Sequence, residues 1–205
     1  ETRNAVYDGP LNKLCLELSN NDNFRRMWGI PLEPALEEKD ADEEIDGAAD
    51  ESTKAGAGMF EKMEDVELVL RFFAYRKIED FKAGLNKITE FLDRFLVAGN
   101  KFPDAGLAEY RAMFVETVDF LWNVLEEDAF TVLDPSKRRP TKIVYDPLMF
   151  VANSPDVVLH RDKLITKKEV LRAELKSMYD NNQALFSGRR TNFKVTQDRN
   201  RCVGD

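Results

Sequence analysis

Apolar residues recur at helical spacing along most of the chain, and this spacing predicts five helices. They are expected at about residues 10–20, 65–78, 85–97 and 104–130, with a last helix beginning near residue 166. Nowhere does apolar and polar alternation run long enough for a substantial sheet. The pattern therefore predicts an all-α fold: a single irregular helical bundle, 1–205, with at most one short strand.

The helix expected at 65–78 is apolar on nearly every side, as in a helix that is buried on more than one face. We therefore place it at the centre of the core. Arg71 and Arg76 interrupt it, and a buried guanidinium must find carboxylate or carbonyl partners. We interpret both arginines as members of buried ion pairs, with contact to a ligand as the alternative.

Short local signals predict the structure between the last two long helices. Residues 143–145 (Ile-Val-Tyr) favour a short strand. Asp146-Pro147 and Ser154-Pro155 each have the form of an N-cap followed by proline at the first helical position. They predict two short helices, which begin at Pro147 and Pro155.

The last long helix has a clear predicted start. Thr166 and Glu169 have the spacing of a capping box, in which the Thr hydroxyl caps the helix and the Glu side chain bonds back. Ile165 and Val170 have the spacing of the hydrophobic staple that accompanies such a cap. A helix start at Thr166 is therefore expected.

The charge of the chain is unevenly distributed. The formal net charge is −8, yet residues 33–51 alone hold ten acidic residues against Lys39. The rest of the chain is close to neutral, so its overall acidity does not exclude a nucleic-acid partner. Because residues 36–58 are acidic and poor in apolar side chains, we predict a mobile acidic loop there. The alternative is an acidic mimic that occupies a basic groove.

The C-terminal segment, 187–205, is predicted to be a basic polar tail. Between residues 187 and 201, five cations oppose one acid. Arginine forks and short polar side chains suit phosphate oxygens, and residues 137–139 add three more cations. The candidate phosphate or DNA contacts are Arg189, Arg190, Thr191, Asn192 and Lys194. The alternative is a solvated basic terminus that pairs with the acidic segment.

Candidate chemistry is sparse. His160 is the single histidine, which excludes multi-histidine metal sites, and no nucleophile is evident beside it. No glycine-rich phosphate loop occurs. Cys15 and Cys202 are too few for a disulfide framework, and no apolar run reaches the roughly 18 residues of a membrane helix. We expect a cytoplasmic protein without a complete catalytic constellation or a metal site.

Four segments together resemble one protein family. They are residues 1–12 (ETRNAVYDGPLN), 65–76 (DVELVLRFFAYR), 91–96 (FLDRFL) and 187–192 (SGRRTN). Their order and content are similar to those of the ParB-like restriction proteins related to GmrS and GmrD, long catalogued as a domain of unknown function. The resemblance spans nearly the whole chain, and its first two motifs are specific only in combination.

The resemblance implies a C-terminal helical part of a two-part domain. In the family, the preceding part has a ParB/sulfiredoxin-like fold with an Asp-Gly-Gln-Gln-Arg-type motif linked to nucleotide hydrolysis. That motif is not present in this sequence, so no catalytic residue is carried over. The resemblance implies that a nucleoside triphosphate and Mg²⁺ would belong to the full-length parent. We interpret the chain as a fragment, since it begins with Glu1 and has no initiator Met.

The resemblance also implies partners: the upstream ParB-like domain, DNA and, in many members, a His-Asn-His nuclease domain. Glu1, Arg3 and Asn4 are then expected at the interface with the missing half. The implied function is support of nucleotide or DNA recognition in anti-phage restriction, with relay to the nuclease. The alternative is a helical interaction or oligomerisation module, such as a homodimer, without a nucleic-acid role. A hydrolase that uses His160 is a third hypothesis.

Overall fold

The computed structural model describes residues 8–32, 58–59, 62–136, 139–187 and 192–204, and every regular element in these ranges is a helix. The predicted all-α fold is thus confirmed, and the described ranges contain no strand. The acidic segment predicted at 36–58 lies outside the described residues except for its last residue. The elements are α2 (Pro10–Leu18), α3 (Asp22–Trp28), α5 (Glu64–Tyr75), α6 (Ile78–Phe81), α7 (Ile88–Gly99), α8 (Asp104–Leu125), a 3-10 turn (Glu126–Asp128), α9 (Lys142–Ala152), α10 (Pro155–Thr166), α11 (Lys168–Asn181), α12 (Gln183–Phe186) and α13 (Phe193–Gly204).

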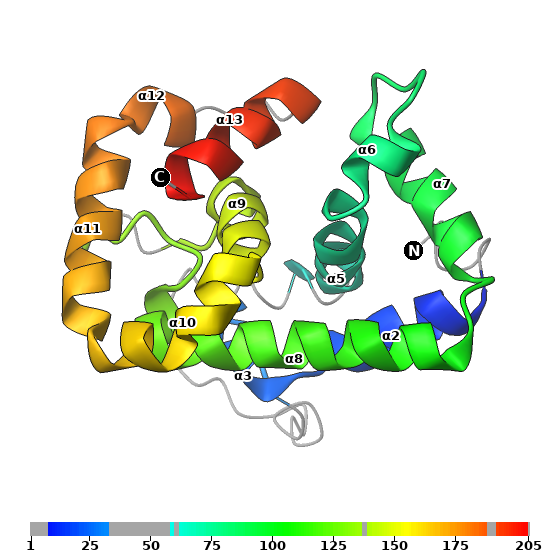
Figure 1. The fold of residues 1–205 in the computed structure, drawn as a ribbon, viewed down its shortest axis with the longest axis horizontal. Helices are drawn as coiled ribbons and strands as arrows, with labels where there is room; N and C mark the ends of the chain where they lie inside the picture. Colours follow the sequence, from blue (N-terminus) through cyan, green and yellow to red (C-terminus); the bar gives the residue numbers. More distant parts are fainter. Residues whose placement is uncertain (1–7, 33–57, 60–61, 137–138, 188–191, 205) are drawn as a thin grey trace, which may run out of the picture.

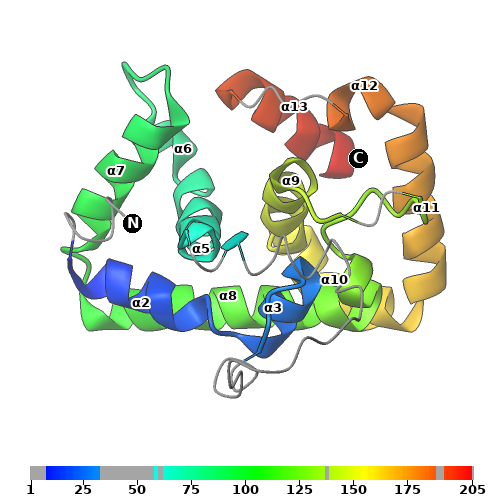
Figure 2. The same cartoon turned by 180° about the vertical axis from the view of Figure 1, so that it is seen from behind.

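Helix α8 forms the base on which the other helices are arranged (Figure 1). Helices α2 and α3 pack along it, and α5 and α9 stand above its middle. Helices α6 and α7 rise at one end of α8, while α10 and α11 leave from the other end (Figure 2). Helices α12 and α13 then turn back, so that α13 lies against α9. The last helix therefore covers α9.

Large rings fill the centre of the molecule. We call the cluster of Phe24, Trp28, Phe114, Phe130 and Tyr145 the aromatic core. The ring centroids of Phe130 and Tyr145 are 4.9 Å apart in an edge-to-face arrangement, and those of Phe24 and Phe114 are 5.5 Å apart. Such pairs add to the stabilisation that ring burial already gives. The aromatic core joins α3, α8 and α9 into one packed unit.

The start of α2 is capped by a residue far away in the sequence. The side-chain oxygen of Asn100, which follows α7, accepts hydrogen bonds from the backbone N–H of Leu11 at 3.1 Å and of Asn12 at 3.3 Å. These N–H groups have no partner within their own helix. A Cβ at Gly9 would collide with the Asn100 side chain, so a glycine is required there. This contact fixes α2 to the turn between α7 and α8.

The strand predicted at 143–145 and the helix start predicted at Pro147 are both wrong. Residues 142–152 form one continuous helix, α9, and Pro147 lies inside it. Proline removes a backbone donor and disfavours the helical conformation of the residue before it. Val144, Tyr145 and Asp146 are all buried in this helix, and their tertiary contacts outweigh the local preference. The second predicted N-cap is confirmed: Ser154 caps α10 by accepting from the N–H of Val157.

The capping box predicted at Thr166 is also wrong. Helix α10 continues through Thr166, whose hydroxyl donates to the carbonyl of Asp162 at 2.8 Å. The next helix begins at Lys168. Val170 is 60% exposed, so it does not form the predicted staple. Lys167 alone separates α10 from α11. The Thr166 hydroxyl does not cap α11, because it is already bonded within the preceding helix.

Helices α3 and α13 lie where the sequence pattern predicts no helix. Helix α3 follows α2 after a short turn and ends at Gly29, whose φ of 63° is the left-handed conformation that glycine adopts easily. Helix α13 occupies most of the segment expected to be a basic polar tail. The buried residues of α13 are Thr196 and Arg199, so its inner face has no apolar period by which it could be recognised.

Candidate functional site

A buried ion pair joins the two central helices. Arg71 on α5 and Asp146 on α9 are each 5% exposed. The Nε of Arg71 donates to Oδ1 of Asp146 at 3.0 Å, and a terminal nitrogen of the same guanidinium donates to Oδ2. This two-point contact uses both carboxylate oxygens and fixes the relative position of α5 and α9. Arg71 is thus in a buried ion pair, as its place in the apolar helix indicates.

Further polar groups extend this pair toward the surface. Arg71 also donates to the Tyr75 hydroxyl at 2.8 Å, and its guanidinium lies 3.8 Å from the carboxylate of Glu67. Lys142 on α9 lies 3.7 Å from the same carboxylate. We call Glu67, Arg71, Tyr75, Lys142 and Asp146 the ionic seam. It alternates cations and anions from the interior to the solvent, so each buried charge has an opposite charge beside it.

The electrostatics of the seam follow from burial and pairing. Burial opposes the charge on Arg71, but the Asp146 carboxylate outweighs it and raises the pKa of Arg71. Burial, and then the negative charge of Asp146, raise the pKa of the Tyr75 phenol well above its usual range. At neutral pH Arg71 is therefore a guanidinium and Tyr75 a neutral phenol. Neither of these two groups is poised to exchange a proton.

Helix α13 covers one side of the seam. Thr196 is 2% exposed and Arg199 is 3% exposed. The Nε of Arg199 donates to the carbonyl of Leu185 at 2.8 Å. Burial lowers the pKa of Arg199, while the negative charge of Asp146 partly offsets this. A second guanidinium thus approaches Asp146 from the C-terminal helix.

The structure describes only two of the predicted phosphate contacts. Asn192 precedes α13, and its side-chain oxygen accepts from the N–H of Val195 at 2.9 Å, so the side chain caps the helix. Lys194 is exposed in the first turn. Arg189, Arg190 and Thr191 lie outside the described residues.

The residues expected at the interface with a missing half, Glu1, Arg3 and Asn4, likewise lie outside the part of the chain that the structure describes. Their predicted role stays a prediction.

Arg76 differs from Arg71. Its guanidinium lies over the Phe72 ring, 5.6 Å from the centroid, and burial lowers the pKa of Arg76, with the Tyr110 charge opposing. Among the described residues it stacks on an aromatic face instead of joining the expected buried ion pair. Arg76 follows the last residue of α5 as its C-cap and is half-buried, whereas Arg71 lies inside the helix and is buried.

His160 lies on α10 and is exposed. Its Nδ1 is 2.8 Å from the carbonyl oxygen of Asp156, one turn earlier in the same helix. This contact is local and places the ring on the outer surface. A catalytic role for His160 gains no support from its surroundings.

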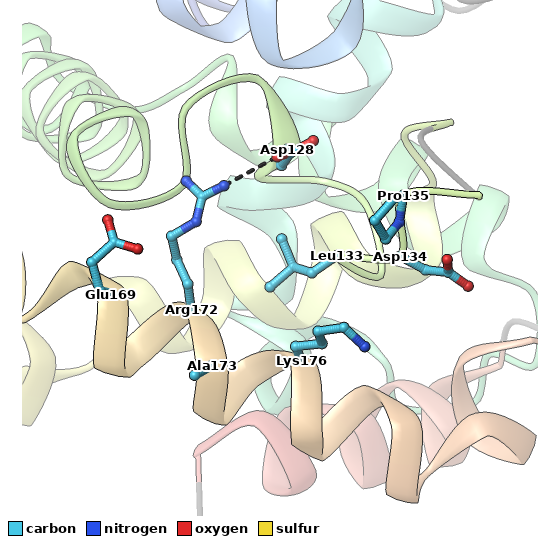
Figure 3. Close-up of a pocket in the computed structure, with 8 residues that line it drawn as sticks. All are labelled: Asp128, Leu133, Asp134, Pro135, Glu169, Arg172, Ala173 and Lys176. Carbon is cyan, nitrogen blue, oxygen red and sulfur yellow. Dashed lines mark hydrogen bonds and ion pairs between the residues drawn. The ribbon is translucent and has the colours of Figure 1, made fainter.

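A shallow pocket of about 350 Å³ lies between α11 and the loop that follows the 3-10 turn (Figure 3). Arg172 reaches across it to Asp128, with 3.1 Å between nitrogen and oxygen, and also donates to the carbonyl of Leu125 at 3.1 Å. Lys176 is paired with Asp180 at 2.6 Å. Both cations of the pocket wall therefore contact acceptors of the protein itself, and the pocket is no stronger candidate than the seam.

The described ranges contain neither a cluster of metal ligands nor a helix that could cross a membrane. They contain no group of three or more His, Cys, Asp or Glu side chains placed to hold a metal ion. Among the same residues, no helix has both the length and the apolar character needed to cross a bilayer. Cys15 is buried and Cys202 is half-buried, and neither is in a disulfide.

Comparison of the chain with protein-family models, with curated proteins and with solved structures gives no match.

Of the ionic seam, the sequence identifies only Arg71 and misses Glu67, Tyr75, Lys142 and Asp146. The proline after Asp146 predicts a helix cap there, and nothing in the sequence pattern gives Arg199 of α13 a role. The signal that could have identified Asp146 is its place between apolar residues, Val144 and Tyr145 on one side and Leu148 and Met149 on the other. An acid in such a run needs a buried cation, and Arg71, within its own apolar run, needs a carboxylate or carbonyl partner.

Proposed function

We propose that this chain is the non-catalytic helical portion of a ParB-like, nucleotide-dependent DNA restriction protein, and that it supports nucleotide or DNA recognition and relays binding to a nuclease. One observation carries the proposal: α13 packs the basic C-terminal segment against the helical body, with Lys194 exposed in its first turn. A cation held on a packed helix loses less entropy when it binds a phosphate than one on a free tail.

The motif that resembles the family's apolar helix supports the same proposal. It corresponds to α5, whose Arg71 is joined to α9 through the ionic seam, and α9 in turn carries α13. A contact made at the start of α13 is therefore connected through packed helices to the centre of the molecule. This arrangement suits a part that positions a ligand and transmits its binding.

A DNA-binding titration at several salt concentrations tests the proposal. At low salt, the variant Arg189→Ala/Arg190→Ala/Lys194→Ala is expected to bind a DNA duplex at least about tenfold more weakly than the wild type. The slope of log K against log salt is expected to fall by about 3, since each lost phosphate contact removes about 0.9. Unchanged affinity and unchanged slope would reject the assignment of these residues.

A matched control removes the same charge elsewhere. Lys101, Lys163 and Lys167 are exposed and lie away from α13 in the sequence. The triple alanine variant at these positions is expected to change affinity less than about threefold, through long-range charge alone. Equal losses in both variants would mean nonspecific attraction instead of a site on the basic segment.

A specific observation favours the second function, a helical interaction module. Helix α10 has no fully buried residue, and Leu159 on α10 is 78% exposed while Val170 on α11 is 60% exposed. Large exposed apolar side chains are found where proteins associate. If this function is correct, the chain forms a dimer in sedimentation velocity that Leu159→Asp/Val170→Asp dissociates. A monomer at all concentrations removes the case for self-association.

A further inference from the structure

Helix α13 is docked by a face that is mostly polar. Its fully buried residues are Thr196 and Arg199, and its apolar contacts come from partly buried residues near its two ends. At the start, the ring of Phe193 meets that of Phe91 edge-to-face, with 5.5 Å between centroids. At the end, Cys202 and Val203 are partly buried. Hydrophobic burial therefore contributes less to the docking of α13 than to that of a helix such as α5.

The buried charge of α13 is costly to desolvate. Arg199 loses its hydration on docking, and this desolvation lowers the pKa of Arg199. The carboxylate it approaches, Asp146, is already engaged at both oxygens by Arg71. Attraction between buried charges repays desolvation only when the geometry is excellent. The docking of α13 therefore sets the desolvation of Arg199 against the contacts that its guanidinium makes, of which the hydrogen bond to the Leu185 carbonyl is one.

A released α13 would not stay helical. It has 12 residues, and isolated helices of this length are marginal in water even for alanine-rich sequences. Docking and helix formation of α13 are therefore coupled. Local cooperative units of this kind open with a lower free energy than the whole molecule.

We propose that α13 is a releasable helix: it separates from α9 and unfolds as a unit while α5, α8 and α9 stay folded. Its release uncovers the side of the ionic seam where Tyr75 and Asp146 meet Thr196 and Arg199. The fold then has two states, a closed one with the seam covered and an open one with a carboxylate, a guanidinium and a phenol accessible to a partner. The release of α13 requires no DNA, so its test does not depend on whether the proposed function is correct.

Hydrogen exchange of the whole chain, followed by mass spectrometry at low urea concentrations, tests the proposal. Amides of α13 are expected to exchange about a hundredfold faster than those of α5, all along the helix. Their exchange should rise with urea, but less steeply than that of α5, since less surface is exposed on release than on global unfolding. Equal rates and equal urea slopes for α13 and α5 would overturn the proposal. Fast exchange confined to the last turn, without urea dependence, is fraying and would overturn it too.

Two substitutions on α13 provide a matched comparison. Phe193→Ala removes the contact with Phe91 and is expected to speed exchange of α13 about tenfold. Arg201→Ala, at an exposed position of the same helix, is expected to change it less than about twofold. No acceleration in Phe193→Ala would contradict a docked state held by this contact.

The two native thiols provide a second readout without engineering. Cys202 belongs to α13, whereas Cys15 is buried in α2. With a thiol reagent in dilute urea, Cys202 labelling is expected to depend weakly on urea and Cys15 labelling steeply, because Cys15 needs global unfolding. Identical urea dependence for both thiols would show that α13 opens only with the rest of the molecule.

Discussion

In the aromatic core, whole rings are removed from water and packed against one another, mostly edge to face, with Trp28 tilted against Phe130 and Tyr145. In the helices α10 to α13, which we call the outer arch, few side chains are buried. Helix α10 has no buried residue, α11 has Leu175 and Tyr179, and α12 has Phe186. The two buried residues of α13 are polar. The core is stabilised by buried area, whereas the outer arch depends on a few specific contacts. The molecule is thus expected to lose its outer arch at a lower free-energy cost than its core.

The largest effect should come from the core. Phe130 is fully buried and contacts Phe24, Trp28 and Tyr145. Phe130→Ala is expected to lower the free energy of unfolding by about 4 kcal/mol, since it removes buried area and leaves a cavity. Urea denaturation followed by circular dichroism measures this. A loss below about 1 kcal/mol would mean that the core closes around the gap, and the contrast with the outer arch would then disappear.

The second largest loss of stability is expected at the ionic seam. Asp146→Asn leaves the buried guanidinium of Arg71 without its compensating charge, and a loss of about 3 kcal/mol in unfolding free energy is expected. The matched control is Asp156→Asn, at an exposed position of α10, which should change stability by less than about 0.5 kcal/mol. Similar values for the two variants would remove the seam from the stabilising contacts.

Within the outer arch, two leucines that differ in burial should differ in the stability cost of their replacement by alanine. Leu175 on α11 is buried at 8% exposure, and Leu175→Ala is expected to cost about 2 kcal/mol. Leu159 on α10 is 78% exposed, and Leu159→Ala should be neutral within about 0.5 kcal/mol. Urea denaturation of both variants measures the difference. Equal costs would indicate that α10 is covered in solution, as an interaction module requires.

A smaller effect is expected at the remote cap of α2. Asn100→Ala removes the acceptor of the N–H groups of Leu11 and Asn12, at a cost of about 1 kcal/mol. Asn123→Ala, at an exposed position of α8, is the control and should stay within about 0.5 kcal/mol. If both variants unfold at the wild-type urea concentration, then solvent replaces the cap without loss.

The smallest expected effect is on the pH dependence of stability, and it arises from the buried carboxyl group of Asp65. Asp65 is buried, and burial raises its pKa above the ordinary 3.8, although the N–H of Val66 and the charge of Arg25 oppose this. Because the folded state holds this proton more tightly, the Asp65 contribution to stability falls as pH rises from 3.8 through the folded pKa. The variant Asp65→Asn should lose that part of the pH dependence, as urea midpoints between about pH 4 and about pH 7 would show. An unchanged pH profile would contradict the assignment.

The sequence predicted the long helices because their apolar residues repeat at helical spacing, as at Phe91, Leu92, Phe95 and Leu96 of α7. It also predicted the N-cap at Ser154, which depends on the adjacent residues alone. Of the candidate site it predicted Arg71, since a charge within an apolar helix requires a partner. It did not identify that partner, because Asp146 is brought to Arg71 by packing and not by spacing.

The sequence by itself determined the helical class and the central place of α5, since both follow from local periodicity and composition. Only the tertiary structure decided that residues 143–147 are helical and that the basic C-terminal segment forms α13. In both cases the local signal is weak or opposed: Pro147 disfavours a helix, and α13 lacks an apolar face. Burial of Tyr145 and pairing of Asp146 with Arg71 supply free energy that no window of neighbouring residues contains, because the contacting residues are distant in the chain.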